Sequence, residues 1–371
     1  MKAFDEIFID KTKYGVKVQT SEYSELGEHI IIDQGQSQIA GYTDREEGLF
    51  EEVPVIVFGD HTRIIKYVDK PFFLGADGVK VLRSKDENAN YKYLYYALKN
   101  AKIPNTGYNR HFKWLKNIQI NYPAVEKQAE IVAILDKVSS VIRKREDELS
   151  VLDDLIKARF VEMFGDVIHN DRKWECQQFS DITTSRLGKM LDTKHQTGTC
   201  KYPYLANFNV QWFRFELGNL NEMDFNEKER EEFCLEDGDL LVCEGGEIGR
   251  CAVWHNQIKK CFFQKALHRV RCNQDIILPD YLSWWFKYNC ENGGFTAIEG
   301  AKATISHLTG TKMKMLDVTV PPIELQEQFV DIIHQVDKSK SAKAMKEPNC
   351  HIIYYMLHFI QNLQETEDIL L

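Results

Sequence analysis

Residues 123–165 read PAVEKQAEIVAILDKVSSVIRKREDELSVLDDLIKARFVEMFG, and this stretch decides how the chain is organised. Pro123 favours a first helical turn, and Gly165 is typical of a C-terminal cap. Between them, ten positions follow at alternating spacings of four and three, and eight of the ten are apolar. This repeat predicts one seam of a long helix that packs against a partner helix. The seam consists of Ile131, Leu135, Val138, Ile142, Arg145, Leu149, Leu152, Ile156, Arg159 and Met163.

The predicted helix is unusually long for a globular protein. At about 1.5 Å per residue it extends for roughly 60 Å, whereas a typical globular helix has three or four turns. Its other faces are crowded with Lys, Arg, Glu and Asp, so it is a solvated rod and not a core helix. The alternative is an ordinary amphipathic helix on a domain surface. The length of the repeat favours a coiled-coil spacer.

The start of this helix recurs 198 residues later in the chain. Residues 116–138 and 314–336 share a strand-like run and then the pattern P-x-x-E-x-Q. The first copy places this pattern at Pro123, Glu126 and Gln128, and the second places it at Pro321, Glu324 and Gln326. A weaker echo at an offset of 188 matches Tyr93-Leu94 with Tyr281-Leu282. The chain is therefore predicted to be an internal duplication.

The duplication divides the chain into two globules and two helices. Residues 1–122 and 166–320 contain short β-rich runs separated by turn residues, with one compact helix in each, which predicts an α+β fold. Residues 123–165 form the central helix, and residues 321–345 form a second, shortened spacer helix. Pro348 ends any continuous helix there, so residues 346–371 are a divergent tail that can still form a short helix.

This layout resembles the specificity subunit of type I restriction–modification systems. The resemblance covers about residues 1–340 and rests on the two P-x-x-E-x-Q helix starts and on the helix end LIKARFVEMFG at 155–165. It implies two mixed, β-rich target-recognition domains separated by long antiparallel coiled-coil helices. It also implies three partners, namely double-stranded DNA, the modification (methyltransferase) subunits and the restriction subunit. S-adenosylmethionine, ATP and Mg are then expected on the partner subunits, and no cofactor on this chain.

The resemblance further implies that the helices dock the modification subunits. The expected docking residues lie on the two helix starts and along the seam. They are Glu126, Gln128, Ile131, Leu135, Ile142, Leu149, Leu152, Ile156, Glu324 and Gln326.

The net charge of −9 argues against a protein that coats nucleic acid by bulk charge. The charge is, however, unevenly distributed along the sequence. Residues 216–239 and 44–52 are strongly acidic, whereas residues 248–273 and 102–121 contain Lys and Arg but no acid. This segregation by segment would suit one face that meets phosphates and another that does not.

Several function classes find no support in the sequence. The nine cysteines form no C-x-x-C pair, which argues against a zinc site and predicts reduced thiols in a cytoplasmic protein. No apolar stretch is long enough to cross a bilayer, so no membrane association is expected. No methyltransferase, nucleotide-binding or metal-nuclease motif is present, and the chain is expected to be non-catalytic, with no bound metal.

Six polar loops between the predicted strands are the candidate DNA-binding elements, because Arg, Lys, Asn, Gln, Glu and His on rigid loops can read base edges. The alternative for each loop is that its polar residues are merely solvated, and Tyr204 lies in an aromatic segment that is more typical of strand packing. The candidates are Gln34, Gln36, His61, Arg63, Tyr108, Asn109, Arg110, His111, Tyr204, Asn207, Asn209, Glu244, Gly246, Arg250, Lys302, Thr304 and His307.

These observations favour a non-catalytic subunit that recognises a bipartite DNA target, with each globule reading one half and the helical spacer setting the gap. The alternative is a coiled-coil protein-interaction scaffold with two binding globules. A third reading is an inactive variant with a displaced tail. Phosphate contacts would make affinity fall steeply with salt, whereas a mixed protein interface would respond weakly.

Overall fold

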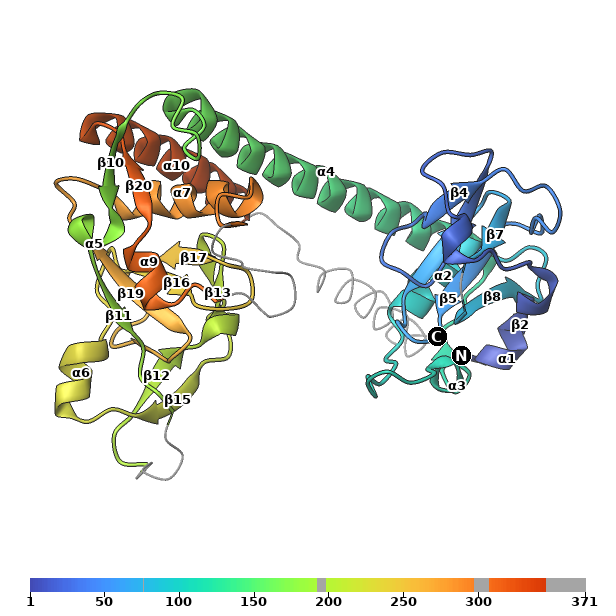
Figure 1. Cartoon of the computed structure of the whole chain (residues 1–371). Coiled ribbons are helices and arrows are strands. Elements are labelled where there is room, and N and C mark those ends of the chain that lie inside the picture. The colour runs from blue at the N-terminus through green and yellow to red at the C-terminus, as the bar shows by residue number, and fades with distance from the viewer. Residues whose placement is uncertain (76, 192–197, 297–306, 345–371) are drawn as a thin grey trace. The chain divides into compact units, whose positions relative to one another are not determined.

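The computed structural model describes residues 1–75, 77–191, 198–296 and 307–344. These residues fall into two compact units, a first within Met1–Glu146 and a second that begins at Asp147. Helix α4 (Val125–Phe164) belongs to both units, because its start packs in the first and its end in the second (Figure 1). The expected long central helix is therefore present as one continuous element.

The first unit is built on a four-stranded antiparallel sheet, a three-stranded sheet and a two-stranded ribbon. The three-stranded sheet pairs its central strand antiparallel on one side and parallel on the other. In sheet order the four-stranded sheet consists of β2 (Phe8–Asp10), β8 (Val79–Ser84), β5 (Val55–Gly59) and β6 (Ile65–Val68). The three-stranded sheet consists of β4 (Gly41–Thr43), β3 (His29–Ile32) and β7 (Phe72–Leu74). The ribbon consists of β1 (Lys2–Ala3) and β9 (Gln119–Ile120). The helices are α1 (Phe4–Ile7), α2 (Tyr91–Lys99) and α3 (Phe112–Leu115).

The second unit repeats this plan strand for strand, with the same pairing directions. The four-stranded sheet is β11 (Thr183–Leu187), β19 (Leu267–Cys272), β16 (Leu240–Cys243) and β17 (Cys251–Val253). The three-stranded sheet is β15 (Asn221–Asp224), β12 (Lys201–Leu205) and β18 (Phe262–Phe263), and β10 (Glu175–Gln178) pairs with β20 (Asp317–Val320). A small hairpin, β13 (Val210–Gln211) and β14 (Arg214–Phe215), is added. The helices are α5 (Phe179–Ile182), α6 (Glu227–Phe233), α7 (Pro279–Glu291), α9 (Gly310–Lys314) and α10 (Ile323–Ala344).

Each four-stranded sheet separates two apolar cores, as one of its two central strands, β5 or β16, shows. Side chains alternate between the faces of a strand. In β5, Ile56 and Phe58 therefore face the core that contains α2 and the start of α4, whereas Val55 and Val57 face the core shared with the three-stranded sheet. In the second unit, β16 is divided between its two cores in the same way. The predicted internal duplication is thus present in the fold.

The end of α4 packs antiparallel to α10 in the second unit. The Phe329 ring lies edge-on to Phe160 and Phe164, with centroids 5.5 and 5.3 Å away, and Lys340 pairs with Asp153. As α10 proceeds from residue 329 to 340, its partners on α4 thus move from residues 160–164 back to 153. The antiparallel helix pair expected from the sequence is confirmed for this part of the chain.

The predicted seam is wrong at its C-terminal end. Arg159 is exposed, and Phe160 is buried against Phe329, Tyr281 and Trp284. The helix ends at Phe164, and Gly165 follows with φ of 74° while its amide donates to Val161 O at 2.9 Å. The left-handed C-terminal cap that this glycine predicts is therefore formed.

Candidate nucleic-acid interface

In the first unit, loop 33–37 and the β5–β6 turn at 59–63 meet residue Asp77. The Gln34 side chain connects them, because its Nε2 donates to Asp77 O at 2.9 Å and its Oε1 accepts from the His61 amide at 3.1 Å. The Thr62 hydroxyl also donates to Gln34 O at 2.7 Å. Gln34 was expected to contact DNA directly, and the structure shows that its amide joins loops that carry other candidate residues.

Lys66, on strand β6, fixes the shape of loop 33–37. Its side chain is almost fully buried, and its Nζ donates to Ser37 O at 2.6 Å and to Asp33 Oδ1 at 3.3 Å. Burial lowers the pKa of this ammonium group, and the Asp33 carboxylate acts in the opposite direction. The loop is therefore a rigid support for the exposed Gln36, as positioning of a binding side chain requires.

Tyr108 and His61 present two stacked rings at the surface. Their centroids are 4.8 Å apart with an interplanar angle of 11°, and Tyr108 is 89% exposed. Arg63 follows in a left-handed conformation with φ of 63°, and its guanidinium donates to Ile103 O at 3.3 Å. Asn109 and Arg110 are exposed beside Tyr108. An exposed aromatic ring followed by exposed Asn and Arg side chains is suited to stacking on bases and to hydrogen bonding with their edges.

His111 does not share this exposed position, although it was expected to contact DNA. It is completely buried, its amide donates to Asp60 O at 2.7 Å and its ring Nδ1 lies 3.0 Å from the same oxygen. The Asp60 carboxylate in turn accepts from the Phe112 amide at 2.7 Å. His111 and Asp60 therefore attach loop 104–111 to the β5–β6 turn, and His111 has a positioning role.

In the second unit, Asn207, Arg250 and His307 meet around the β16–β17 turn. The Arg250 guanidinium donates to both Asn207 O and Oδ1 at 3.2 Å, and Asn207 Nδ2 donates to Gly245 O at 3.1 Å. A Cβ on Gly245 would lie 2.8 Å from the His307 ring, so a larger residue there would have to displace that ring. The amide of Leu308, which follows His307, donates to Glu244 O at 2.8 Å. Gly246 has φ of 87° and forms the exposed tip of the turn.

Two candidates of the second unit are core residues instead. Tyr204 is buried in the apolar cluster of the three-stranded sheet. Asn209 is 1% exposed, and its side chain accepts from the Ala206 amide at 2.9 Å and donates to Glu216 O at 2.9 Å. Their expected contacts with DNA are therefore wrong. Lys302 and Thr304 lie outside the described residues.

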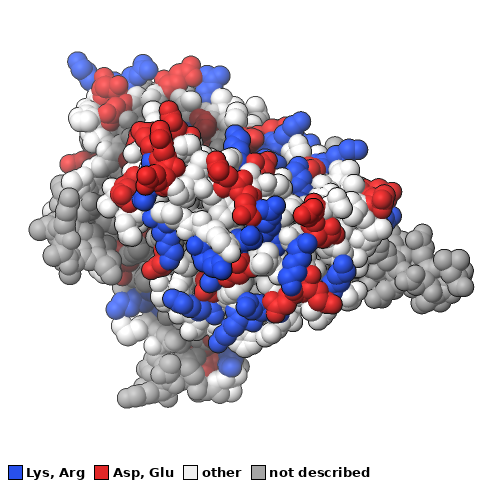
Figure 2. Space-filling model, turned by 90° about the vertical axis from the view of Figure 1, so that its right-hand side faces the viewer, with Lys and Arg blue, Asp and Glu red and all other residues white. Residues whose placement is uncertain are grey.

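The charge separation along the sequence is not kept in space. Arg271, from the basic segment, pairs with Asp239 at 2.7 Å and with Glu236 at 2.9 Å, both from the acidic segment. The hydrogen bond to Asp239 raises the pKa of this guanidinium. Arg269 donates to Glu232 O at 2.9 Å and Cys234 O at 3.2 Å. Figure 2 likewise shows Lys and Arg interspersed with Asp and Glu over one face of the molecule. Any phosphate contacts must therefore come from individual cations and not from a uniformly basic face.

The helix residues expected to dock a partner are divided between the surface and the cores. Glu126 and Glu324 are exposed, and Ile142, Leu149 and Leu152 are half-buried. The others are buried within this chain, so they are not available to a partner, and the expectation is corrected for them. They are Gln128, Ile131, Leu135, Ile156 and Gln326.

A different apolar set on α4 is exposed, and sequence reasoning missed it. Ile134 and Val141 in the first unit are 43% and 49% exposed, and Val151 and Leu155 in the second unit are 65% and 43% exposed. Positions 134, 141 and 155 follow the same seven-residue period as the seam. Their period is visible in the sequence. The predicted seam, however, follows a different face of the helix, which this chain largely buries in its own cores.

The described residues contain no cluster of three or more His, Cys, Asp or Glu that could hold a metal ion. No helix within the same residues is long and apolar enough to span a membrane.

Comparison with known proteins gives one consistent family. A model of the type I restriction modification DNA specificity domain matches residues 11–151 and 171–349, once in each unit. A type I restriction enzyme specificity subunit from Escherichia coli is 29% identical over 348 residues, covering 88% of this chain and 83% of that protein. A putative type I specificity subunit from Haemophilus influenzae is 23% identical over 322 residues, covering 81% and 78%. The crystal structure of the type I restriction–modification S subunit from M. genitalium superposes with a TM-score of 0.55 at 16% identity, covering 96% of this chain and 94% of that one, which shows the shared fold.

Proposed function

Because this chain belongs to the type I restriction modification DNA specificity family and is a specificity subunit, we propose that each of its two units reads one half of a bipartite DNA target. The observation that carries this proposal is the repetition of one fold with a loop cluster at the same place. In both units the turn between a central strand and the edge strand of the four-stranded sheet, β5–β6 or β16–β17, meets the segment that follows the middle strand of the three-stranded sheet. The contacts are Gln34–His61 in the first unit and Asn207–Arg250 in the second. Two copies of one DNA-binding unit on a single chain suit a target with two half-sites.

The residues that contact bases in this proposal are those the structure exposes or half-exposes. In the first unit Tyr108 stacks, and Gln36, Asn109 and Arg110 hydrogen-bond to base edges or phosphates. In the second unit Arg250 and His307 do so together with the turn at Gly246. His111 and Gln34 position these groups.

Helix α4 is the spacer between the two half-sites in this proposal. Its 40 residues form one helix without Pro or Gly, and each end packs in a unit core. A helix lengthens by about 1.5 Å per residue. Insertion of one helical turn between Lys137 and Asp147 should therefore lengthen the gap between the half-sites without changing either half.

The modification subunits dock, we propose, on the exposed apolar residues of α4. Ile134 and Val141 lie outside the first core, and Val151 and Leu155 lie outside the second core. Exposed aliphatic side chains on one helix, three of which (Ile134, Val141 and Leu155) follow a seven-residue period, are suited to a partner helix or groove. The restriction subunit would join the complex of this chain with the modification subunits. S-adenosylmethionine, ATP and Mg would bind to the partners, and this chain would act as a non-catalytic cytoplasmic subunit.

The test uses the chain assembled with its modification subunit. Sequencing of methylated bases in host DNA gives the target, and binding is then measured to this duplex and to duplexes with either half scrambled. Both scrambled duplexes should bind more weakly at matched salt, since each mismatched base pair costs about 1–3 kcal/mol. Equal binding to all three would reject the proposal and favour a protein-interaction scaffold.

Tyr108→Ala and Arg250→Gln test the assignment of the halves. Tyr108→Ala should weaken the preference for the correct sequence only in the half-site read by the first unit. Arg250→Gln should do so only in the half-site read by the second unit. Ile134→Asp tests the docking surface separately, because loss of the modification subunit is expected with little change in unfolding.

A further inference from the structure

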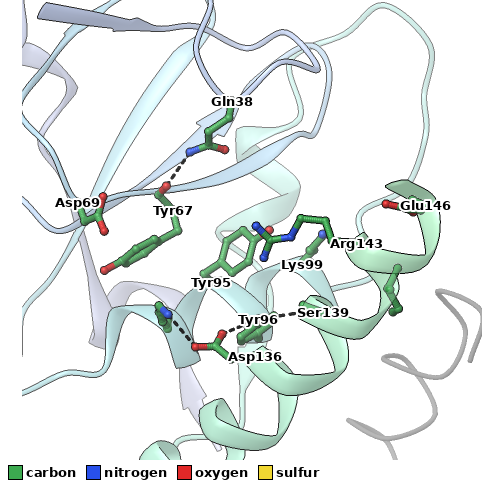
Figure 3. Close-up of a pocket in the computed structure, with 12 residues that line it drawn as sticks. Gln38, Tyr67, Asp69, Tyr95, Tyr96, Lys99, Asp136, Ser139, Arg143 and Glu146 are labelled. Atoms are coloured by element: carbon green, nitrogen blue, oxygen red, sulfur yellow. Dashed lines mark hydrogen bonds and ion pairs between the residues drawn. The ribbon is translucent and has the colours of Figure 1, made fainter. Parts of the chain in front are cut away.

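Two adjoining hollows form a groove on the first unit, next to the candidate DNA-binding loops. The larger has a volume of about 610 Å³ and lies between β6, α2 and the first part of α4 (Figure 3). The smaller, of about 470 Å³, extends to Gln36 and Arg63. Both are lined by Gln38, Tyr95 and Lys99. The groove therefore leads from the candidate base-reading loops to the spacer helix.

One acid in this groove is already neutralised. Asp136 of α4 accepts from Lys92 Nζ and from the Tyr96 hydroxyl, each at 2.7 Å. The hydrogen bond to Asp136 raises the pKa of Lys92, which keeps this ammonium protonated. The ion pair fastens α4 to α2, and its charges cancel.

Two cations remain in the groove without an ion-pair partner. Within the described residues, Lys99 and Arg143 form no ion pair, and the Lys99 ammonium lies 5.5 Å from the centre of the Tyr95 ring. Against the effect of burial, the hydrogen bonds from Lys92 and Tyr96, and to a smaller extent the charge of Arg143, lower the pKa of Asp136. Figure 3 shows Arg143 on α4 and Lys99 on α2 directed toward the Tyr95 ring. Asp69 and Glu146 also line the larger hollow, so the groove is not uniformly positive. Two like charges on separate elements facing one hollow suit an anion between them.

The repeat provides an internal comparison for Lys99. At the offset of 188 its counterpart is Lys287 of α7, since Tyr93 matches Tyr281. Lys287 is paired with Glu291 at 3.1 Å, and Glu291 also binds Lys157 at 2.7 Å. The second unit therefore neutralises the position that the first unit leaves unpaired, and the unpaired cation is a property of the first unit and not of the shared fold.

The side chains of this groove are of the kinds that contact a sugar–phosphate backbone. It combines cations on two elements, an aromatic ring and amide side chains, and it continues from Arg63 in the reading turn. Such side chains contact the sugar–phosphate backbone and fix register without reading sequence. A polypeptide partner would not explain why the groove begins at the reading loops.

We propose that this groove holds the phosphate backbone of the DNA beside the half-site read by the first unit, with Lys99 and Arg143 as positioning residues. The inference rests on the proposed function and adds to it a direct contact between DNA and the spacer helix. The half-site would then be held in register by α4 as well as by the loops.

The test measures the salt dependence of binding by the complex with its modification subunit. Lys99→Gln, Arg143→Gln and the double variant are titrated from about 50 to 200 mM salt against target and scrambled duplexes. Each lost phosphate contact should reduce the slope of log K against log salt by about 0.9, and the double variant by about 1.8. The change should be equal for both duplexes, so the target preference stays the same. Lys287→Gln and Lys144→Gln are the matched controls, with slopes expected to equal the wild-type slope.

Unchanged slopes in the Lys99 and Arg143 variants, with target preference retained, would overturn this inference and leave the proposed function standing. Loss of the modification subunit from these variants at an unchanged slope would also overturn it, because the groove would then hold protein. A wild-type complex that shows no target preference would reject the proposed function instead, and the slopes on either duplex would still test the groove.

Discussion

Replacement of Gln326 by Leu should destabilise the second unit far more than the same change at its repeat counterpart Gln128. Gln326 is fully buried at the start of α10. Its Oε1 accepts from the Leu278 amide at 2.9 Å, and its Nε2 donates to Ile276 O at 3.0 Å and to Pro321 O at 2.8 Å. One side chain thus satisfies three backbone groups and joins α10 to the segment that leads into α7.

The expected cost follows from the groups left unpaired. A buried backbone donor or acceptor without a partner costs about 1–3 kcal/mol. The three groups around Gln326 should together cost about 3–5 kcal/mol, because Leu regains some apolar burial. For the second unit this corresponds to a fall in Tm of roughly 10 °C. Gln128 makes one such bond, to Pro123 O at 2.9 Å, so Gln128→Leu should cost about 1 kcal/mol.

Tryptophan fluorescence during urea unfolding reports mainly on the second unit, because five of the six tryptophans lie there and Trp114 lies in the first. Peptide-resolved hydrogen exchange then measures each unit separately, which avoids treating a two-unit chain as two-state. Equal destabilisation by the two substitutions would refute the reasoning, as would a Gln326→Leu protein within about 1 kcal/mol of the wild type.

Phe160→Ala should lower the free energy of unfolding of the second unit by about 3–5 kcal/mol, measured by urea unfolding. Val161→Ala, at the exposed neighbouring residue, should lower it by less than about 1 kcal/mol. His268 is nearly fully buried, and burial lowers its pKa, so the unfolded state binds the additional proton. Stability of the second unit should therefore decrease as the pH falls below about 6.5, and His268→Gln should remove part of that decrease in unfolding at several pH values; an unchanged pH profile would contradict this. His111→Ala should increase hydrogen exchange in residues 104–110 and weaken binding to every duplex, and unchanged exchange there would contradict its positioning role.

The duplication and the long helix were predictable because both depend on periodic spacing that the sequence displays directly. The P-x-x-E-x-Q starts predicted where each helix begins, and their glutamines proved to be buried links within the chain. The strand order was not predictable, since it depends on pairing between segments far apart. The error at Arg159 has a physical cause. A straight helix drifts by about 20° per heptad relative to a strict seven-residue repeat, so a different face reaches the second core by Phe160.

The candidate site was predicted at the level of loops and not of side chains. Loops 33–37, 59–63 and 244–250 do meet other polar segments, because turns at the ends of paired strands lie close together. Which polar residues are exposed could not be predicted. Asn209 and His111 are polar but buried, since backbone groups nearby need partners and a side chain supplies them. Lys99 and Arg143 could not be predicted in this way, because they lie on helices and not on loops between strands.

The two units differ in how equivalent polar residues are used, and this difference has a functional consequence. The order and direction of the strands in the four-stranded and three-stranded sheets are the same in both copies, so the difference between the units lies in their side chains and added elements. Lys99 faces a groove without an acidic partner, whereas Lys287 is neutralised by Glu291. If both units bound DNA in the same way, the second unit would need another free cation to make the phosphate contact that Lys287, unlike Lys99, cannot make. The two arginines of strand β19, Arg269 and Arg271, are instead engaged within the unit. The first unit should therefore supply more of the salt-dependent affinity, and the second should depend more on direct base contacts.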